Sequence, residues 1–410
     1  MFWAPTQIAS LGNFIIAGEN LMKSFLVFAV LYNISILFFF KYFNFFSDSL
    51  RTIFDQFNVF YNVPSFKVLL PVGISFYTFQ TMSYTIDMYK RKIEPARTFL
   101  DFALYVTFFP QLVAGPIVRA QDLITQFYEE KKASLNQFIW GTFLLTIGLF
   151  QKVVMADSLL ADTSDTVFDS GQLIHGIDAW VGTLAFSGQI FFDFAGYSTC
   201  AIGIALMLGI ILPDNFKYPY ASLGFSDLWK RWHITLSSWL RDYLYIPLGG
   251  NRHGITRMYV ALMVTMLLGG LWHGAAWTFV VWGGLHGLYL AAERWLKARF
   301  GERAIWSRFW VQILLAFVTY FLINITWVFV RGGDFATAWR MIVTMLTFVT
   351  DGEKVLPMVH VVETVVTIGI MLLVHWYMRE RRLDEEIRRM PAWLTGLVWG
   401  VMLTLIIITQ

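Results

Sequence analysis

Histidines inside apolar sequence are the residues of this chain best placed to do chemistry. His273 lies in the segment 266–289, between a glycine pair and Gly274, with no charged residue nearby in the sequence. An ionisable residue in a long apolar run is costly to bury, so it indicates a functional site. Removing water from an imidazole favours its neutral form, which can act as a general base near neutral pH. The pattern therefore predicts a buried general base at His273.

A second histidine, His233, lies in the segment 226–254, SDLWKRWHITLSSWLRDYLYIPLGGNRHG. Apolar residues recur there at helical spacing, so we expect an amphipathic helix that lies in the membrane interface and ends before Pro247. On that helix His233 falls on the membrane-facing side, one turn from Trp229. The apolar stripe comprises Trp229, Trp232, Leu236, Leu240 and Tyr243, and the polar side comprises Lys230, Arg231, Ser237, Ser238 and Arg241.

The remaining histidines and the single cysteine do not form a metal or nucleophile motif. His286 shares the apolar run of His273, but on one straight helix their separation places them well over half a turn apart, so we interpret His286 as a packing residue. His175, His253, His360 and His375 are expected in loops or at interfaces. No HExxH, GxSxG or Walker-type loop is present, and Cys200 alone cannot supply a thiolate cluster. We therefore predict no metal site and no bound cofactor.

The composition identifies the surroundings of these histidines as a lipid bilayer. Hydrophobic residues make up 57% of the chain and charged residues 14%, more apolar than the surface of a soluble protein allows. The net charge of +3 is too small to indicate a nucleic-acid partner. The start, MFWAPTQIAS, lacks the pattern of a cleavable signal, so we expect the helices themselves to direct insertion.

Apolar runs of about 20 residues, the length that crosses a bilayer, recur along the chain. A further stretch, 99–118, is interrupted by Pro110, Gly115 and Pro116, and we expect it to be re-entrant or interfacial and packed inside protein. The predicted spans are 24–43, 68–87, 135–155, 180–210, 258–292, 308–330, 358–378 and 393–409.

Charges between the runs predict the topology. Basic residues crowd 90–97, 217–257, 294–308 and 379–389, which the positive-inside rule makes cytoplasmic, whereas the acidic stretch 156–179 suits an external loop. The span 258–292 then begins and ends on the cytoplasmic side, so it must fold back around the glycines at 269–274 or 283–284. We therefore predict one all-α polytopic membrane domain over 1–410, with 226–292 as its catalytic core.

Several long motifs in one order resemble the membrane-bound O-acyltransferase (MBOAT) family, and within it the bacterial alginate O-acetylase branch. The resemblance covers most of residues 40–330. Members of the family carry further hydrophobic helices before the first motif, so the resemblance implies a shortened or divergent N-terminal part here. The motifs are KYFNFF (41–46), LLPVGISFYTFQTMSYTIDMYK (69–90), FFPQLVAGPIVRAQDL (108–123), QIFFDFAGYSTCAIGIALMLGI (189–210), DLWKRWHITLSSWLRDYLYIPLGGNR (227–252) and LLGGLWHGAAWTFVVWGGLHGL (267–288).

The resemblance implies a helical bundle with re-entrant and interfacial helices around a central funnel, in the bacterial inner membrane. It implies transfer of an acetyl group from a cytoplasmic donor, acetyl-CoA, toward hydroxyls of an extracytoplasmic polysaccharide, with a periplasmic acetyltransferase as partner. Alginate, cellulose, another exopolysaccharide and peptidoglycan all remain open as the acceptor. The family pattern places the catalytic histidine in Trp272–His273–Gly274 and a second important histidine in Arg231–Trp232–His233.

The resemblance leaves more than one role open for several site residues. His273 would take the proton of the attacking hydroxyl in direct transfer, or carry the acyl group itself in a relay. His233 would orient the thioester or hold His273, flanked by Trp232 and Trp272. Arg241 or Arg252 could meet the anionic face of coenzyme A. We expect Asp193 to be a structural partner of an arginine, with a role in the site as the alternative.

Other functions also fit parts of the pattern. D-alanyl transfer to teichoic acid belongs to a related branch of the family. A transporter would also use re-entrant helices and polar residues at the membrane midplane, but it should show paired inverted halves, and the 227–288 pattern has no second copy. A non-catalytic scaffold of a polysaccharide secretion complex is the third alternative, and it would tolerate loss of His273.

Overall fold

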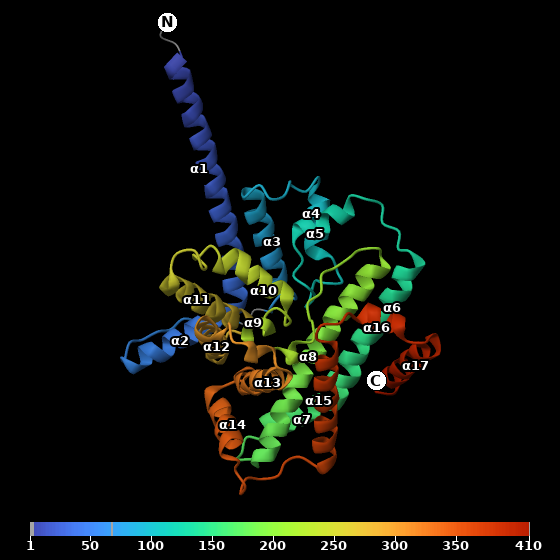
Figure 1. The fold of residues 1–410 in the computed structure, drawn as a ribbon. Helices are drawn as coiled ribbons and strands as arrows, with labels where there is room; N and C mark the ends of the chain where they lie inside the picture. Colours follow the sequence, from blue (N-terminus) through green and yellow to red (C-terminus); the bar gives the residue numbers. More distant parts are fainter. Residues whose placement is uncertain (1–3, 67–68, 410) are drawn as a thin grey trace. The chain divides into compact units, whose positions relative to one another are not determined.

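The computed structural model describes residues 4–66 and 69–409, which form helices, loops and an isolated bridge between Ile174 and Glu353 (Figure 1). The all-α fold class is therefore confirmed. The chain divides into two compact units: the first holds residues 1–113 and 117–131, and the second holds 114–116 and 132–410. The prediction of one membrane domain over 1–410 stays a prediction.

The first unit contains the helix that runs from α1 into α2. An irregular stretch, 108–119, all but 114–116 of which belongs to this unit, confirms the predicted break of the run 99–118. Tyr105 Oη donates a 3.0 Å hydrogen bond to the carbonyl oxygen of Val118, and the Gln111 amide donates to that of Tyr105. Such contacts satisfy backbone groups that lipid could not. The helices are α1 (Ala4–Leu37), a π-helical turn (Phe38–Tyr42), α2 (Phe43–Gln56), α3 (Ile74–Tyr89), α4 (Phe99–Thr107) and α5 (Ala120–Phe127).

The second unit is built around the long helix α8 (Gly176–Met207), which packs against α6 (Leu135–Leu149) and α7 (Asp162–Phe168) (Figure 1). A π-helical stretch, Phe150–Ala161, joins α6 to α7. The prediction of an external loop over 156–179 is thus wrong for its first half. No proline or glycine interrupts 156–168, and Ala156, Leu160 and Val167 are fully buried in the core, so packing keeps this acidic segment helical.

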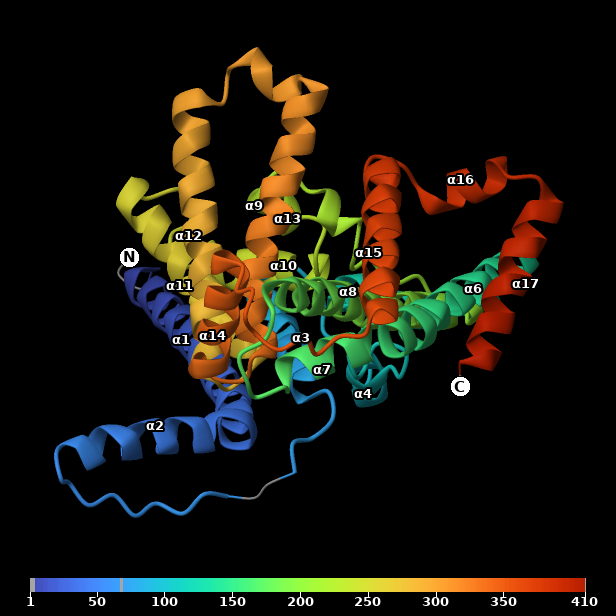
Figure 2. The same ribbon diagram turned by 90° about the horizontal axis from the view of Figure 1, so that it is seen from below.

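Three of four further helices pack on α8 and complete the core of the second unit, and the fourth packs elsewhere (Figure 2). They are α13 (Phe309–Arg331), α14 (Phe335–Thr347), α15 (Met358–Met378) and, beyond the short α16 (Leu383–Arg389), α17 (Ala392–Ile408), which packs on α6. Sequence analysis left α14 unassigned.

Six helices of the described residues are long and apolar enough to cross a membrane, as a multi-pass protein requires. They are Glu19–Gln56, Leu135–Phe168, Gly176–Met207, Ile255–His273, Phe309–Arg331 and Met358–Met378. Three predicted spans differ: α3 is a helix of 16 residues, 258–292 is split into two helices, and the span 393–409 is the shorter helix Ala392–Ile408.

The helices α11 (Ile255–His273) and α12 (Trp277–Phe300) pack against each other, and the chain folds back between them at 274–276. The predicted fold-back near 269–274 is therefore confirmed. Ahead of this pair, the chain runs through a 3₁₀ turn (Pro219–Ala221), α9 (Phe225–Leu228), α10 (Ile234–Leu240) and a π-helical turn (Arg241–Tyr245). The predicted continuous amphipathic helix over this region is therefore wrong, because the chain turns sharply at His233.

Candidate active site

His273 is the last residue of α11, at the elbow of the α11–α12 pair. Gly274 follows in an extended conformation, and a Cβ there would lie 2.2 Å from the Phe279 ring, so only glycine fits without movement. Extended backbone at Gly274 and Ala276 ends the helix and lets α12 return beside α11. The Trp-His-Gly motif is thus a structural corner with a half-buried imidazole at its tip.

The elbow also brings His286 close to the same aromatic side chain as His273. The Trp282 ring lies 5.0 Å from the His273 ring and 4.8 Å from the His286 ring, between ring centroids. The assumption of one straight helix through both histidines is wrong, because the helix breaks between them. His286 is buried, and its Nε2 lies 3.2 Å from Thr326 Oγ1, which is compatible with the packing role predicted for it.

His233 lies between α9 and α10 with φ +44° and ψ +54°, a left-handed conformation that is uncommon for residues other than glycine. Its side chain is 0% exposed, so the predicted membrane-facing position is wrong. Its ring centroid lies 6.4 Å from that of His273 and 6.1 Å from that of Trp272. Burial, and then the neighbouring His273, lower the pKa of His233 well below its ordinary value, so this imidazole is neutral.

Asn215, in the loop after α8, binds the turn that carries His233. Its Oδ1 lies 3.1 Å from His233 Nδ1 and accepts hydrogen bonds from the backbone N–H and the hydroxyl of Thr235. Its backbone carbonyl accepts from the N–H of Ile234, and its Nδ2 donates to Ser198 Oγ on α8. Sequence analysis did not select Asn215, and the only signal for it was its position in the polar stretch PDNF beside the apolar end of α8.

Tryptophans form the walls around the histidines. Trp272 is buried, with its ring 5.0 Å from that of His273. Trp232 is also buried and packs edge-on against Phe216 at 5.1 Å and near Trp327 of α13 at 5.2 Å. These aromatic side chains lie inside the protein.

Arg231 of the Arg-Trp-His motif is buried and binds three partners, an arrangement called the Arg231 clamp below. Its Nε lies 2.8 Å from Asp227 Oδ1, and its two terminal nitrogens donate to Glu380 Oε1 and to the carbonyl oxygen of Arg379, at the end of α15. Burial raises the pKa of Asp227, but the Leu223 N–H and Arg231 lower it by more, so the carboxylate stays charged. Arg231 therefore joins α9 to α15.

Two of the other predicted site residues, Arg241 and Asp193, make ion pairs with neighbours. Arg241 pairs with Asp242 at 2.7 Å and is largely exposed, and Arg252 is exposed in the turn before α11. Asp193 on α8 is half exposed and pairs with Lys152 at 2.5 Å, so the expected arginine partner is wrong. The same lysine pairs with Asp157, which explains a basic residue near the outer end of the predicted span 135–155.

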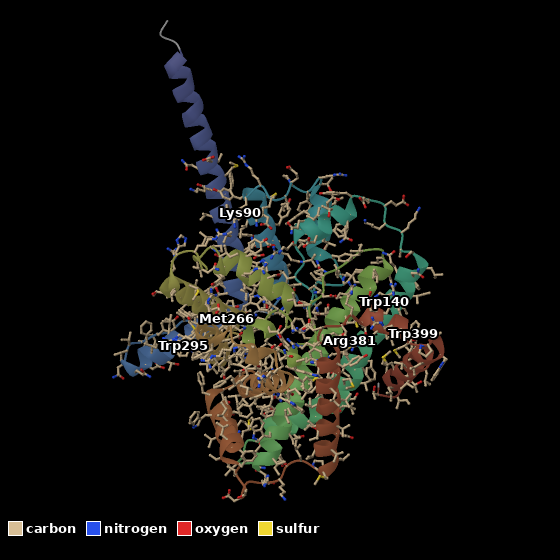
Figure 3. All side chains as sticks on the ribbon, in the orientation of Figure 1. Lys90, Trp140, Met266, Trp295, Arg381 and Trp399 are labelled. Carbon is tan, nitrogen blue, oxygen red and sulfur yellow. The ribbon has the colours of Figure 1, made fainter. Side chains whose placement is uncertain are left out.

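A groove of about 1500 Å³ reaches Asn215 from the surface of the second unit. Its walls are apolar and come from α6, α8 and the end of α15, and Figure 3 labels two of its lining residues, Trp140 and Arg381. Burial raises the pKa of Asp214 beside Asn215, against the influence of Arg382 and Lys217. The charged residues of its rim are Asp214, Lys217, Arg381, Arg382, Asp384, Glu386 and Arg388. Such a groove suits an amphiphile with an anionic group.

The two predicted site histidines lie near each other, at the α11–α12 elbow and at the turn before α10. Within the described residues, no group of three or more His, Cys, Asp or Glu side chains is arranged to hold a metal ion. A neutral, fully buried His233 beside a half-buried His273 leaves His273 as the imidazole with access to a reactant.

The sequence is similar to proteins that transfer acyl groups. It is 44% identical over 347 residues to "Probable alginate O-acetylase AlgI" of Azotobacter vinelandii, which covers 85% of this chain and 67% of that protein. It is 38% identical over 351 residues to "Peptidoglycan O-acetyltransferase" of Helicobacter pylori, covering 79% and 65%. It is 26% identical over 286 residues to "Teichoic acid D-alanyltransferase" of Streptococcus thermophilus, covering 64% and 68%.

These matches leave about a third of each relative without a counterpart here, since the chain spans about two thirds of their length.

The family itself is established over most of the chain, because the model described as "MBOAT, membrane-bound O-acyltransferase family" matches residues 17–332. That match includes both histidine motifs and the whole α9–α12 region. The chain therefore belongs to the membrane-bound O-acyltransferase family.

Proposed function

We propose that this protein is an O-acetyltransferase that moves an acetyl group from cytoplasmic acetyl-CoA toward hydroxyls of an extracytoplasmic polysaccharide. The observation that carries the proposal is the juxtaposition of His273, at the α11–α12 elbow, with the neutral, buried His233. Membership of the family supports acyl transfer as the reaction class. The identity to O-acetylases is higher than the identity to the D-alanyltransferase, which supports acetyl as the group that is transferred.

In direct transfer, the acceptor hydroxyl oxygen attacks the thioester carbonyl carbon while His273 takes the hydroxyl proton. The carbon–sulfur bond then breaks, and the thiolate leaves with the proton that His273 returns. In a relay, His273 itself attacks and carries the acetyl group before the acceptor takes it. His233 supports His273 in either route, with Trp232 and Trp272 as the walls that exclude water.

The donor would approach from the cytoplasmic side, which the basic region 217–257 marks. Arg241 and Arg252 lie in this region and are exposed, as binding of the coenzyme A phosphates requires. Asp193, held by Lys152, supports α8 and takes no part in transfer.

The names of the relatives support a polysaccharide as the acceptor. Alginate and peptidoglycan are the polymers in their names, and we propose a periplasmic acetyltransferase that completes delivery, with the chain in the bacterial inner membrane. D-alanyl transfer has support only from a relative of 26% identity, so it is the weaker alternative.

Transfer of labelled acetyl from acetyl-CoA tests the proposal, in inner-membrane vesicles that hold this protein, its partner and the polymer. His273→Ala should insert normally and transfer no label, whereas the control His360→Ala, a histidine at the start of α15 near Asp162, should transfer normally. Full transfer by His273→Ala would rule out the proposed role. A transporter or scaffold predicts no label on the polymer even with wild-type protein and a verified partner.

A further inference from the structure

We infer that Asn215 is a positioning residue that fixes His233 in the tautomer with its proton on Nδ1, so that Nε2 faces the site as a hydrogen-bond acceptor. Asn215 is 1% exposed, lies 18 residues before His233 in the chain, and belongs to none of the predicted site residues. The inference rests on the proposed function only for the consequence of this tautomer for catalysis.

The tautomer follows from the donors around the Asn215 amide. The backbone N–H of Thr235 can only donate, and its partner is Asn215 Oδ1 at 3.3 Å, so the oxygen of the amide faces α10. The Thr235 hydroxyl donates to the same oxygen at 2.9 Å. His233 Nδ1, 3.1 Å from this oxygen, must therefore carry a proton. In a neutral imidazole the other nitrogen, Nε2, then holds the lone pair.

The reverse orientation of the amide is excluded by the backbone of Thr235. Turning the amide over would place its NH₂ group against the Thr235 N–H and would leave this buried donor without an acceptor. In the orientation observed, Asn215 Nδ2 lies 3.1 Å from Ser198 Oγ on α8 and donates to it, which a hydroxyl group allows. The Thr235 N–H therefore sets the direction of the amide.

Asn215 also holds the strained turn of His233. Ile234 and Thr235 are the first two residues of α10, where N–H groups have no partner within the helix. Asn215 accepts both, one at its backbone oxygen at 2.9 Å and one at Oδ1. A second backbone bond, from Lys217 N–H to the Arg231 carbonyl, ties the two segments together. These contacts offset the cost of the left-handed conformation of His233.

The tautomer limits the roles open to His233. A neutral imidazole with its only proton bound to Asn215 cannot donate to the oxygen that becomes negative when a thioester is attacked. It can only accept a hydrogen bond, at Nε2, and the His273 ring, 6.4 Å away between centroids, is too distant to bond to it directly. The geometry thus assigns His233 an accepting role in the site, and Asn215 to keeping His233 in the accepting form.

Two substitutions separate this role from a purely structural one. Asn215→Ala removes the acceptor of the His233 N–H. We expect kcat to fall by about 10–100-fold with the KM for acetyl-CoA unchanged, which is the usual effect of removing a group that orients a metal-bound histidine in metalloenzymes. Asn215→Asp keeps the acceptor but adds a charge that favours protonated His233, so the acid limb of the pH–rate profile should move to higher pH by about one unit or more.

The matched control is Asn324→Ala. Asn324 is also buried, but its amide donates to the Tyr320 carbonyl within α13, so activity and pH profile should stay those of the wild type. Wild-type kcat and pH profile in Asn215→Ala would overturn the inference. If Asn215→Ala does not fold, Asn215→Asp decides: an unmoved acid limb in a folded, active Asn215→Asp protein would equally overturn it.

A measurement without turnover keeps the inference independent of the proposed function. In the full chain labelled with ¹⁵N-histidine, the His233 signals, assigned by their loss in His233→Gln, should show a protonated Nδ1 and an unprotonated Nε2. Asn215→Ala should abolish this pattern. Protonated Nε2 in the wild type would overturn the inference. The expected tautomer in a protein that transfers no acetyl group would instead refute only the proposed function.

Discussion

Gly270 and Gly283 bring the backbones of α11 and α12 into contact, because a Cβ on Gly270 would lie 3.0 Å from the Cα of Gly283. The same Cβ would lie 2.3 Å from the carbonyl oxygen of Phe279, and one on Gly283 would lie 2.3 Å from that of Met266. Small residues let membrane helices pack at backbone distance. This contact holds the elbow that carries His273, so its two glycines act on the site through the backbone.

Gly270→Ala should destabilise the protein and reduce acetyl transfer together. The added methyl group meets backbone rather than a flexible side chain, so the helices must separate, at a cost of about 1–3 kcal/mol for overpacking. Gly284→Ala is the matched control, since its Cβ would meet only Leu267 Cδ2 at 3.3 Å. Thermal unfolding of the purified protein measures the difference, and equal melting temperatures for the two variants would show that the glycine contact does not set the elbow.

Gly274→Ala should displace His273 without unfolding the bundle. Its Cβ would lie 2.2 Å from the Phe279 ring, and a shift of about 1 Å at a catalytic group can cost on the order of 100-fold in rate. The double variant Gly274→Ala with Phe279→Ala should recover part of kcat, because it removes the clash. Steady-state acetyl transfer by the four proteins of this cycle measures the coupling.

The control for this prediction is Phe279→Ala alone, which should keep more activity than Gly274→Ala. Rates that simply multiply across the cycle would mean that the glycine is needed for its backbone conformation and not for space beside Phe279.

The fold class, the multi-pass membrane character and a fold-back near 269–274 could be predicted from sequence, because each depends on local signals: apolar length, basic flanks and glycines. The break at His233 could not. Its helical stripe, from Trp229 to Tyr243, is regular, and the left-handed turn is imposed by contacts with Asn215, which is distant in sequence. Tertiary contacts override helical periodicity there.

The structure brings the two predicted histidine motifs near each other. The roles assigned to their residues stay predictions. The grouping of His286 with His273 around Trp282 could not be seen, because a helix break of three residues changes the angle between them. The wall formed by Trp327 comes from α13, which shares no motif with the α9–α12 region. The acidic residues of 156–168 suggested a loop, but the apolar residues of this stretch form a continuous face that packs against α8 and keeps it helical.

Arg231→Lys should destabilise the protein by about 1–3 kcal/mol, although the charge is kept. Lysine cannot reproduce the fork that contacts Asp227, Glu380 and the Arg379 carbonyl at once, and Asp227 would lose its buried partner. Arg382→Lys is the control, because Arg382 is exposed and exposed ion pairs contribute about 0–1 kcal/mol. Chemical or thermal unfolding of both variants in detergent measures the effect, and equal losses would show that the clamp contributes little.

His233 should make the protein less stable as the pH falls below about 6.5. Its folded-state pKa lies well below the ordinary value of 6.5, so in acid the unfolded chain binds a proton that the folded chain does not. Stability from this residue is therefore full above pH 6.5 and is lost as the pH falls, at up to about 1.4 kcal/mol per pH unit. Thermal unfolding between pH 7.5 and 5.0 measures the slope.

His233→Gln should flatten this slope, because glutamine can still donate to Asn215 but does not titrate. His253→Gln, which changes an exposed histidine in the turn before α11, should leave the slope unchanged. The same shift makes a prediction for catalysis: with His233 neutral throughout this range, the acid limb of wild-type activity must come from another group. An acid limb that disappears in His233→Gln while transfer continues would contradict the neutral, accepting role of His233.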